Sequence, residues 1–377
     1  MNHQRRRPLQ NEPIARPEER GRQEPTDVGD LARTTRTQLE DIFKGSPMNV
    51  YIRGIGTYLP EKIVSNHDLA KQIDTSDEWI WSRTGIRERR IAAEGEHAST
   101  MGKRAAEEAI RNAGLSPDDI DLLVVATMTP DFLFPSTAAV LQAQLGLRNV
   151  PAFDISAACS GFLYGLEVTR HLLQSGTYRN ALLVGTEKLS SVLDWQDRST
   201  CVLFGDGAGA VVLSQGATGI IDVLLAADGS NPDILYMPGG GSRMPATEAS
   251  VAHRDHFLKM NGREVFKVAV RAMEQSIRDI LDRNSININD IRYFIAHQAN
   301  YRILDALAQR LSVPMEKFPV NVDRVGNTSA ASIPLIMKEM VDDGRLKSGD
   351  NVVLVAFGAG LTWGTSLLKW KDSREMP

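Results

Sequence analysis

The chain has 377 residues, 42% of them hydrophobic and 24% charged, a composition typical of a globular protein with one large domain or two fused domains. Its formal net charge of −4 gives no reason to expect a nucleic acid or an anionic membrane as a partner. No apolar run reaches the length of about 18 residues that a membrane span needs, and two cysteines cannot build a disulfide framework. We therefore expect a cytoplasmic protein.

Residues 1–47 differ in composition from the rest of the chain. They contain many Arg, Pro and Gln residues, mix both signs of charge and show almost no apolar periodicity. Such a segment cannot bury enough surface to repay its ordering entropy, so we expect a disordered extension. Its acidic residues argue against a mitochondrial presequence. Met48, directly before an apolar strand, is an alternative start of translation.

From residue 48 onward, apolar strands alternate with helices. Thr75 and Glu78 form a Thr-x-x-Glu capping box at the start of a helix that stops at Gly85. Ser99 is a candidate N-cap for an amphipathic helix that ends at Asn112 and is closed by a glycine. The strands expected in this first half are 50–58, 121–127, 152–155, 180–186 and 204–213, and its further helices are 136–145 and 159–174.

The strand at 204–213 contains Gly205-x-Gly207-x-Gly209, a spacing that invites a dinucleotide-binding interpretation. That fingerprint requires a strand before the glycines and a helix after them. Here the strand-like segment AVVL follows the glycines. We therefore interpret them as positions of close backbone packing within a sheet.

The second half repeats the order of the first. A long polar loop is expected at 228–251 and a long helix at 257–283. After these, RYFIAH echoes DLLVVAT, LAQRL echoes LQAQL, FPVNVDRVGNTSAAS echoes PAFDISAACSG, and NVVLVAFG echoes NALLVGT, each roughly 170 residues later. A fifth and looser echo links 362–368 with the glycine-rich strand.

Repetition at this period indicates a duplicated α/β half rather than a solenoid. Strands alternating with helices predict mostly parallel sheets that are covered on both faces. We expect the extension at 1–47, a first half at 48–220 and a second half at 221–377. The helix that follows Cys159 is apolar on nearly every side, which predicts burial between the two halves.

Cys159 follows a turn of small residues, at the point where this apolar helix is expected to begin. Unpaired backbone N–H groups and the helix dipole favour negative charge there. The pKa of a thiol, ordinarily ~8.5, can fall to roughly 3.5–7.5 in such a site, which predicts a nucleophile at neutral pH. The alternative is a buried structural cysteine, which is our interpretation of Cys201 in the strand-like segment TCVLF.

Two polar residues of the second half are candidates to join Cys159, because a pseudo-twofold would bring loops at equivalent sheet ends together. Of the seven histidines, only His297 follows a buried strand, the position at which α/β sheets carry ligand groups. Asn327 lies in VGNTSAAS, the echo of the cysteine loop. The alternatives are that His297 is structural and that Asn327 is a turn residue before a helix cap.

Four separated motifs, ISAACSGF, IAHQAN, VGNTSAAS and AFGAGLTWG, together resemble the β-ketoacyl-acyl-carrier-protein synthase III family of thiolase-fold condensing enzymes. The resemblance runs from about Met48 to Trp370, and TSDEWI and FGDGAGA support it. It implies a layered αβαβα fold of two pseudo-symmetric halves and a homodimer. It also implies that Cys159, His297 and Asn327 are the catalytic residues.

The activity implied by the resemblance is a decarboxylative Claisen condensation that initiates fatty-acid synthesis. The thiolate of Cys159 would attack an acyl-coenzyme A such as acetyl-coenzyme A, and the backbone N–H groups of Cys159 and Ala359 would hold the oxyanion. His297 and Asn327 would then bind the thioester oxygen of malonyl-acyl-carrier-protein and stabilise the enolate that forms as carbon dioxide leaves. The covalent chemistry requires no metal and no redox cofactor.

The same resemblance implies the substrate contacts. Trp79 and Arg198 look like the pair that flanks the adenine of coenzyme A, and Arg83 like a contact to its nucleotide end; Trp79 is alternatively an ordinary core aromatic. Phe134 resembles the residue that reaches across a dimer to close the acyl pocket. A basic patch that docks the acidic carrier protein, or alternatively a solvated helix face, is expected at Lys259, Lys267, Arg302 and Arg310.

Two residues depart from the family's pattern. Ser160 stands where alanine is frequent, and Ala359, in the middle of the late glycine loop, keeps its N–H but has a narrower range of backbone conformations. Two other functions are open: a relative that serves a secondary pathway, and a non-catalytic acyl binder on the same fold. The presence of Cys159, His297 and Asn327 argues against the acyl binder. The length and branching of the acyl chain are not predicted.

Overall fold

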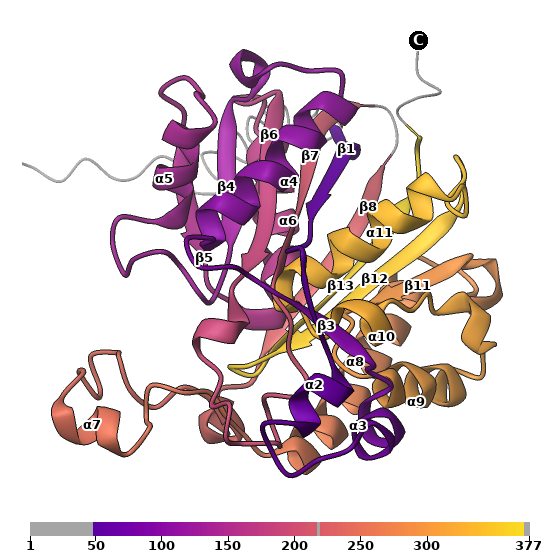
Figure 1. Cartoon of the computed structure of the whole chain (residues 1–377). Helices are drawn as coiled ribbons and strands as arrows, with labels where there is room; N and C mark the ends of the chain where they lie inside the picture. The colour runs from indigo at the N-terminus through magenta and orange to yellow at the C-terminus, as the bar shows by residue number, and fades with distance from the viewer. Residues whose placement is uncertain (1–47, 217–218, 373–377) are drawn as a thin grey trace, which may run out of the picture. The chain divides into compact units, whose positions relative to one another are not determined.

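The computed structural model describes residues 48–216 and 219–372, so the expected extension at 1–47 lies outside the described residues. Figure 1 shows two β-sheets and the helices around them. The first sheet contains β1 (Asn49–Tyr58), β4 (Leu122–Ala126), β5 (Ala152–Ile155), β6 (Asn180–Glu187) and β7 (Gly207–Gly216). The second contains β8 (Ile220–Ala227), β11 (Tyr293–Ala296), β12 (Asn351–Gly358) and β13 (Thr362–Lys369).

The remaining elements surround these sheets. Two small ribbons are formed by β2 (Lys62–Ser65) with β3 (Glu88–Ile91) and by β9 (Leu235–Tyr236) with β10 (Lys259–Met260). The helices of the first half are α2 (Asn66–Ala70), α3 (Asp77–Thr84), α4 (Ala98–Asn112), α5 (Thr137–Gln144) and α6 (Gly161–Gln174). Those of the second half are α7 (Glu248–Ala252), α8 (Gly262–Arg283), α9 (Tyr301–Leu311), α10 (Val322–Val325) and α11 (Ser332–Asp342).

The two sheets share one topology, which confirms the predicted duplication. The order β1-β7-β6-β4 of the first sheet matches the order β8-β13-β12-β11 of the second. In both, the first two pairings are antiparallel and the third is parallel. The expectation of mostly parallel sheets is therefore wrong. β12 and β13 are joined by a tight turn, which permits only an antiparallel pairing, because a parallel pairing needs a long crossover.

The strand β5 has no counterpart among the described residues of the second half. Residues 318–321, which echo β5 in sequence, form no strand. Instead, the side-chain amide of Gln298 donates to the Pro319 carbonyl at 3.1 Å and accepts from the Asn321 N–H at 3.1 Å. These hydrogen bonds satisfy backbone groups that a neighbouring strand would otherwise satisfy.

The elements stack in five layers, as the αβαβα prediction states. α4 and α5 pack on the outer face of the first sheet, and α8 and α9 on the outer face of the second. α6 and α11 lie between the sheets, within one apolar core that contains strands of both halves. Alternate residues of β4 show the layering: Leu122 and Val124 belong to this central core, and Leu123 and Val125 to the outer one.

The central helix α6 is not apolar all round. Phe162, Leu163 and Leu166 are fully buried, as expected for a helix between two sheets, but Val168 is 38% exposed. One edge of α6 therefore reaches the surface.

The boundary expected between the halves, after residue 220, stays a prediction. In the structure, β8 begins at Ile220.

Two helix N-caps differ from those expected. Ser76, rather than Thr75, caps α3, because its hydroxyl accepts the Trp79 N–H at 3.1 Å. The cap of α4 is His97, and Ser99 lies inside the first turn, where its hydroxyl donates to Asp131. Gly85 ends α3 as predicted, at a φ of 71° that favours glycine.

The segment between β8 and α8 is more structured than expected. The predicted loop at 228–251 contains β9 and the start of α7, and α7 lies on an arm that extends from the sheets (Figure 1). α8 begins at Gly262 rather than near residue 257, because Lys259 and Met260 pair with β9.

The glycine run lies in and before β7, as expected of close backbone packing. A Cβ atom on Gly205 would lie 2.3 Å from the Val325 carbonyl oxygen, and one on Gly209 would lie 2.6 Å from the Pro334 side chain. These glycines let the second half approach the first sheet.

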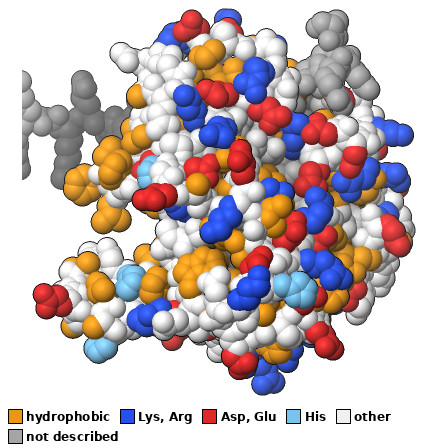
Figure 2. Space-filling model, viewed as in Figure 1, with side chains coloured by type: hydrophobic (Ala, Val, Ile, Leu, Met, Phe, Trp, Pro, Cys, Tyr) orange, Lys and Arg blue, Asp and Glu red, His pale blue; other side chains and the backbone are white. Residues whose placement is uncertain are grey.

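Within residues 48–216 and 219–372, no helix has the length and apolarity to cross a membrane. The face in Figure 2 mixes acidic and basic side chains.

Candidate active site

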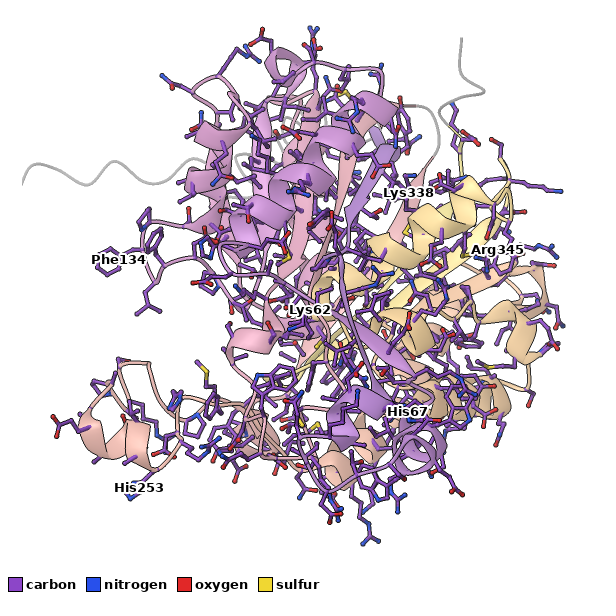
Figure 3. The ribbon with its side chains drawn as sticks, viewed as in Figure 1. Lys62, His67, Phe134, His253, Lys338 and Arg345 are labelled. Atoms are coloured by element: carbon purple, nitrogen blue, oxygen red, sulfur yellow. The ribbon has the colours of Figure 1, made fainter. Side chains whose placement is uncertain are left out.

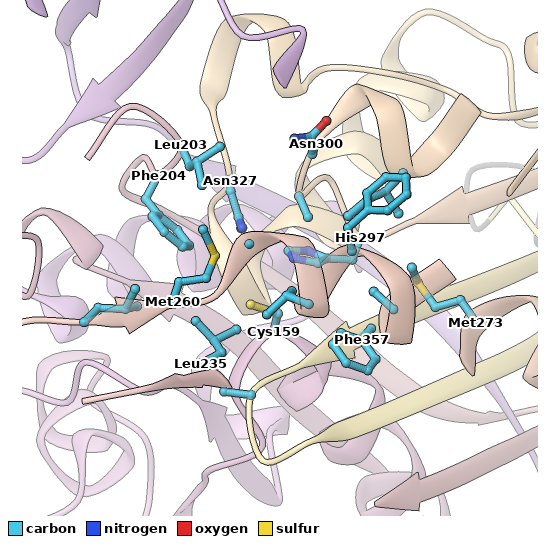
Figure 4. A pocket seen from close by; sticks show the side chains of 18 of the residues that line it. Cys159, Leu203, Phe204, Leu235, Met260, Met273, His297, Asn300, Asn327 and Phe357 are labelled. Atoms are coloured by element: carbon cyan, nitrogen blue, oxygen red, sulfur yellow. The ribbon is translucent and has the colours of Figure 1, made fainter. Parts of the chain in front are cut away.

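Cys159, His297 and Asn327 line one cavity of about 130 Å³, to which both halves contribute. Figure 4 shows the three side chains pointing toward a common space. The other walls are mainly apolar and include Met128, Phe204, Leu235, Met260, Phe266 and Phe357. The predicted convergence of the three polar residues is therefore present in the structure.

Cys159 lies in a single 3-10 turn, Ala158–Ser160, between β5 and α6. Ala158 has a φ of 46°, in the left-handed region, where a small side chain is least strained. The second half repeats this geometry: Ser329, with a φ of 49°, begins the 3-10 turn Ser329–Ala331 before α11. The cysteine loop and the asparagine loop therefore resemble each other in backbone conformation as well as in sequence.

The surroundings of Cys159 oppose the prediction of an ionised thiol. Burial raises the pKa of Cys159 to about 12, against the opposing effect of a hydrogen bond from Ser329. The negative charge of Glu187 raises the pKa further. Desolvation in this apolar cavity outweighs the favourable position before α6, so Cys159 is a neutral thiol at pH 7.

His297 follows β11, as predicted, and is only 3% exposed. Its backbone N–H donates to Val355 at 2.8 Å, and its Nδ1 lies 2.7 Å from the hydroxyl oxygen of Ser332. Burial lowers the pKa of His297 to about 3, so the ring is neutral at physiological pH. The Ser332 oxygen also accepts the Gln298 N–H at 3.4 Å, which favours donation of its own hydrogen to Nδ1. We therefore assign the ring proton to Nε2.

Asn327 is oriented by its neighbours. Its backbone N–H donates to Leu203 at 2.8 Å and its carbonyl accepts from Gly205 at 3.0 Å. Its side-chain oxygen accepts the Ser329 N–H at 2.9 Å. With the oxygen engaged, the NH₂ group is the end of the amide that is left to donate into the cavity. His297 and Asn327 thus supply two neutral hydrogen-bond donors beside a thiol.

The late glycine loop packs directly on the cysteine turn. A Cβ atom on Gly358 would lie 2.7 Å from the Cys159 nitrogen and 3.0 Å from the Ser160 nitrogen. Ala359 follows and lines the cavity. The Thr362 side chain fixes the loop, since its hydroxyl donates to Ala157 at 3.1 Å and lies 2.7 Å from the Ser160 hydroxyl. Ser160, one of the two departures from the family's pattern, thus ties the two segments together.

The predicted coenzyme A residues meet at the mouth of the cavity. The guanidinium groups of Arg83 and Arg198 lie 4.5 and 5.1 Å from the centre of the Trp79 ring. All three line a surface depression of about 550 Å³ that shares Phe266 and Asn300 with the cavity. Trp79 is half-buried, and the depression offers its ring and several cations to an anionic aromatic ligand.

Three of the four predicted carrier-protein residues lie on the adjacent helices α8 and α9, and the fourth lies in β10. Lys267 and Arg302 line the mouth, together with Arg263, which sequence reasoning missed. Arg310 lies about two turns further along α9 and forms an ion pair with Glu274. Lys259 is half-buried in β10.

Phe134 does not line the cavity of the single chain. It is 86% exposed and lies next to Phe132 and Leu133, which are 56% and 84% exposed. Figure 3 labels Phe134 at the edge of the molecule, where Figure 2 shows a group of hydrophobic side chains. An apolar loop with this exposure is typical of an interaction surface.

Several residues around the site were not singled out from the sequence: Glu187, Asn300, Ser329 and Ser332. Glu187 ends the apolar strand β6 and is fully buried. A polar residue at the end of an apolar strand is the signal that identified His297, and it would have identified Glu187 too. Cys201 is fully buried and does not line the cavity, as expected of a structural thiol.

A duplicated αβαβα fold with a thiol, an imidazole and a carboxamide in one apolar cavity defines a thiolase-fold protein of the condensing type. The sequence model described as 3-oxoacyl-[acyl-carrier-protein] synthase III matches residues 153–229, and the model of its C-terminal part matches residues 281–370. The β-ketoacyl-[acyl-carrier-protein] synthase III of Caldanaerobacter subterraneus is 49% identical over 321 residues, which are 85% of this chain and 97% of that protein.

Solved structures agree with these matches. The 3-oxoacyl-[acyl-carrier-protein] synthase III from Aquifex aeolicus is 47% identical, with a TM-score of 0.79 over 85% of this chain and 100% of that one. The priming β-ketosynthase from the R1128 polyketide pathway is 36% identical, with a TM-score of 0.80 over 87% of this chain and 98% of that one. The chain belongs to the β-ketoacyl-[acyl-carrier-protein] synthase III family.

Proposed function

We propose that the protein catalyses the decarboxylative condensation of an acyl-coenzyme A, such as acetyl-coenzyme A, with malonyl-acyl-carrier-protein. The products are 3-oxoacyl-acyl-carrier-protein, carbon dioxide and free coenzyme A, and the reaction starts fatty-acid synthesis. The observation that carries the proposal is the convergence of Cys159, His297 and Asn327 in one cavity. The relative and the solved structure at 47–49% identity both carry the synthase III name, whereas the polyketide ketosynthase is 36% identical.

In the first half-reaction, the sulfur of Cys159 attacks the thioester carbonyl and coenzyme A leaves. The thiol is neutral before substrate binds, so its proton departs during attack and ends on the leaving coenzyme A sulfur. Negative charge develops on the carbonyl oxygen, next to the backbone N–H groups of Cys159 and Ala359. One such donor typically contributes about 2.7–4 kcal/mol to transition-state stabilisation. Ala359 supplies this N–H as well as a glycine would.

In the second half-reaction, malonyl-acyl-carrier-protein takes the place of coenzyme A. The Nε2–H of His297 and the NH₂ of Asn327 donate to its thioester oxygen, and the carbon–carbon bond to the carboxylate breaks to release carbon dioxide. The resulting enolate carbon attacks the carbonyl of the acyl-cysteine, and the Cys159 thiolate leaves. Ser332 and Ser329 keep both donors in place through their hydrogen bonds to His297 and Asn327. This chemistry uses no metal or redox cofactor.

The mouth of the cavity fits the substrates of this reaction. Trp79 and Arg198 would hold the adenine of coenzyme A, and Arg83 its nucleotide end, since all three line the depression that leads to Cys159. Lys267 and Arg302 at the same mouth would attract the acidic carrier protein. Lys267 and Arg310 also form exposed ion pairs, with Glu264 and Glu274 respectively, which a carrier protein would compete with.

The exposed loop that carries Phe132, Leu133 and Phe134 suits a homodimer, in which Phe134 would reach the acyl pocket of the other copy. The assembly proposed is therefore a cytoplasmic homodimer, with acyl-coenzyme A and the acyl carrier protein as its partners. Neither a nucleic acid nor a membrane takes part in the proposed reaction.

Mass spectrometry of the intact protein tests the proposal in two stages. Incubation with acetyl-coenzyme A should add one acetyl group, and the label should map to Cys159. Addition of malonyl-acyl-carrier-protein should remove the label and release carbon dioxide. Cys159→Ala should take up no acetyl group, whereas Cys201→Ala should behave as the wild type. An unmodified Cys159 would favour an acyl binder, and acylation without condensation would contradict the proposed second half-reaction.

A further inference from the structure

Arg89 is a buried cation behind the asparagine loop, and the proposed mechanism gives it no role. It lies in β3 and is 0% exposed. Its guanidinium donates to the carbonyls of Val64 and Val202 at 3.0 and 2.8 Å, and to the side-chain oxygen of Asn66 at 2.9 Å. These acceptors are all neutral, so burial of the charge has a desolvation cost that an apolar side chain of this size would avoid. The guanidinium is therefore explained by the acceptors that it holds.

The Val202 carbonyl belongs to the segment that carries Asn327. The carbonyl of the next residue, Leu203, accepts the Asn327 N–H at 2.8 Å, and the Gly205 N–H donates to the Asn327 carbonyl at 3.0 Å. These two hydrogen bonds form an isolated parallel bridge. The backbone position of Asn327 therefore depends on this segment, and Arg89 holds the peptide group at which the segment begins.

The Cβ atom of Arg89 lies close to both sides of this bridge. Gly326 immediately precedes Asn327. A Cβ atom on Gly326 would lie 3.1 Å from the Arg89 Cβ atom, and one on Gly205 would lie 3.3 Å from it. The strand β3 also packs on α10, which leads into Gly326 (Figure 1). Arg89 thus supports the asparagine loop through its Cβ atom and the opposite segment through its guanidinium.

We propose that Arg89 is a positioning residue for Asn327. It holds the two backbone segments of the bridge together, so that the Asn327 NH₂ group stays where it can donate to the malonyl thioester. Arg89 does not line the cavity and touches no reacting group. The inference rests on the proposed function, because it concerns the donor that Asn327 supplies in the second half-reaction. Loss of the Arg89 guanidinium should therefore impair that half-reaction and spare the first.

The test compares the two half-reactions in wild type and Arg89→Met. Methionine fills most of the same space but donates no hydrogen bond. Acetylation of Cys159 is measured by intact-mass spectrometry, and release of carbon dioxide is then measured in a single turnover of the acetylated enzyme with malonyl-acyl-carrier-protein. A displacement of about 1 Å can cost about 10²-fold in rate, so we expect release of carbon dioxide to slow by about 10- to 100-fold. Acetylation should stay within about threefold of the wild-type rate, since the oxyanion donors of that step do not depend on Asn327.

Acetyl-coenzyme A is kept at saturating concentration in these assays. Arg89 also holds Asn66, whose side-chain NH₂ donates to Asp77 at the start of α3 at 2.8 Å. Because α3 carries Trp79 and Arg83, a variant of Arg89 could weaken the binding of coenzyme A. Saturation removes that effect from the comparison of the two half-reactions.

Arg90→Met is the matched control. Arg90 is the next residue of β3, so its side chain lies on the other face of the strand, where its guanidinium donates to the Pro60 carbonyl at 3.2 Å. Both half-reactions should proceed at wild-type rates in this variant. Arg89→Lys keeps the charge but replaces the planar fork by one ammonium group, so release of carbon dioxide should slow by about threefold or more. Circular dichroism verifies that each variant is folded, and Arg89→Lys decides the test if Arg89→Met does not fold.

A double variant shows whether Arg89 acts through Asn327. In Asn327→Ala the donor is already lost, so the addition of Arg89→Met should not slow release of carbon dioxide further. A further loss as large as that of the single Arg89 variant would overturn the inference. Wild-type release by the folded Arg89 variants, or equal slowing of both half-reactions, would equally overturn it. A wild-type enzyme that acetylates Cys159 but releases no carbon dioxide would overturn the proposed function itself, and the inference with it, before any variant is compared.

Discussion

Replacement of Gly358 by alanine tests whether the backbone of the cysteine turn sets the rate of acyl transfer. The new Cβ atom would lie 2.7 Å from the Cys159 nitrogen, 3.0 Å from the Ser160 nitrogen and 3.2 Å from the Ala157 oxygen. Ordinary contacts at this atom begin near 3.4 Å. All three neighbours are backbone atoms, so relief of the closest contact to 3.4 Å needs a movement of about 0.7 Å, which exceeds the ~0.5 Å that productive geometry tolerates.

The movement acts on the N–H of Cys159, one of the two proposed oxyanion donors. Loss of one such donor lowers kcat by about 10²–10³-fold, equivalent to about 2.7–4 kcal/mol. We therefore expect Gly358→Ala to slow acetylation of Cys159 by that factor, measured as the rate of adduct formation with acetyl-coenzyme A. The overpacked turn should also cost about 1–3 kcal/mol of folding free energy.

Gly229→Ala is the matched control, because a Cβ atom on Gly229 meets nothing within 4 Å. It should retain wild-type acetylation and stability. Rates are compared well below the melting temperature of each variant, so that loss of stability is not mistaken for loss of catalysis. Acetylation of folded Gly358→Ala within about threefold of the wild type would refute the reasoning.

Three further predictions concern other parts of the molecule. His297→Ala should still acquire an acetyl group on Cys159 but should release no carbon dioxide from malonyl-acyl-carrier-protein; equal loss of both half-reactions would contradict the assigned role. Since burial raises the pKa of Glu187 from 4.5 to about 7, the folded protein retains a proton that the unfolded chain loses in this interval. The contribution of Glu187 to stability is thus present below pH 4.5 and is lost as pH rises through 7. In urea unfolding, Glu187→Gln should gain up to about 3 kcal/mol relative to wild type between pH 4.5 and 8, and a parallel pH profile would count against the raised pKa. Deletion of residues 1–47 should leave kcat/KM within about twofold, and a larger loss would show that the segment contributes to the active enzyme.

The duplicated fold could be predicted because its signal is long-range and redundant. Four pairs of segments repeat at nearly one spacing, and they identify β4 with β11, α5 with α9 and β6 with β12 as equivalent elements. Strand direction could not be predicted in the same way, since apolar runs such as NVVLVAFG look alike in parallel and antiparallel pairings. The caps of α3 and α4 were misplaced by one or two residues because Thr75 and Ser76 both suit a cap, and only the fold selects between them.

The site could be predicted in position but not in electrostatics. Cys159 and His297 are marked by their places after apolar strands, and Asn327 by its loop. The pKa of Cys159 depends on how much water and charge reach the sulfur, which the local sequence does not encode. Glu187 illustrates the limit: its strand-end position is visible in NALLVGTE, but the Ser329 hydroxyl that donates to it lies 142 residues away in the sequence.

Cys159 belongs to the first half of the chain, whereas His297 and Asn327 belong to the second. The apolar core between the two sheets holds these halves together. Side chains such as Phe162 and Ile336 are fully buried in that core and touch no substrate in the proposed reaction. Truncation of such a side chain would leave every reacting group chemically intact but would loosen the position of the Cys159 sulfur relative to the His297 ring. The apolar core between the two halves therefore sets the alignment of the catalytic groups. Destabilising substitutions in this core should slow turnover before they unfold the protein.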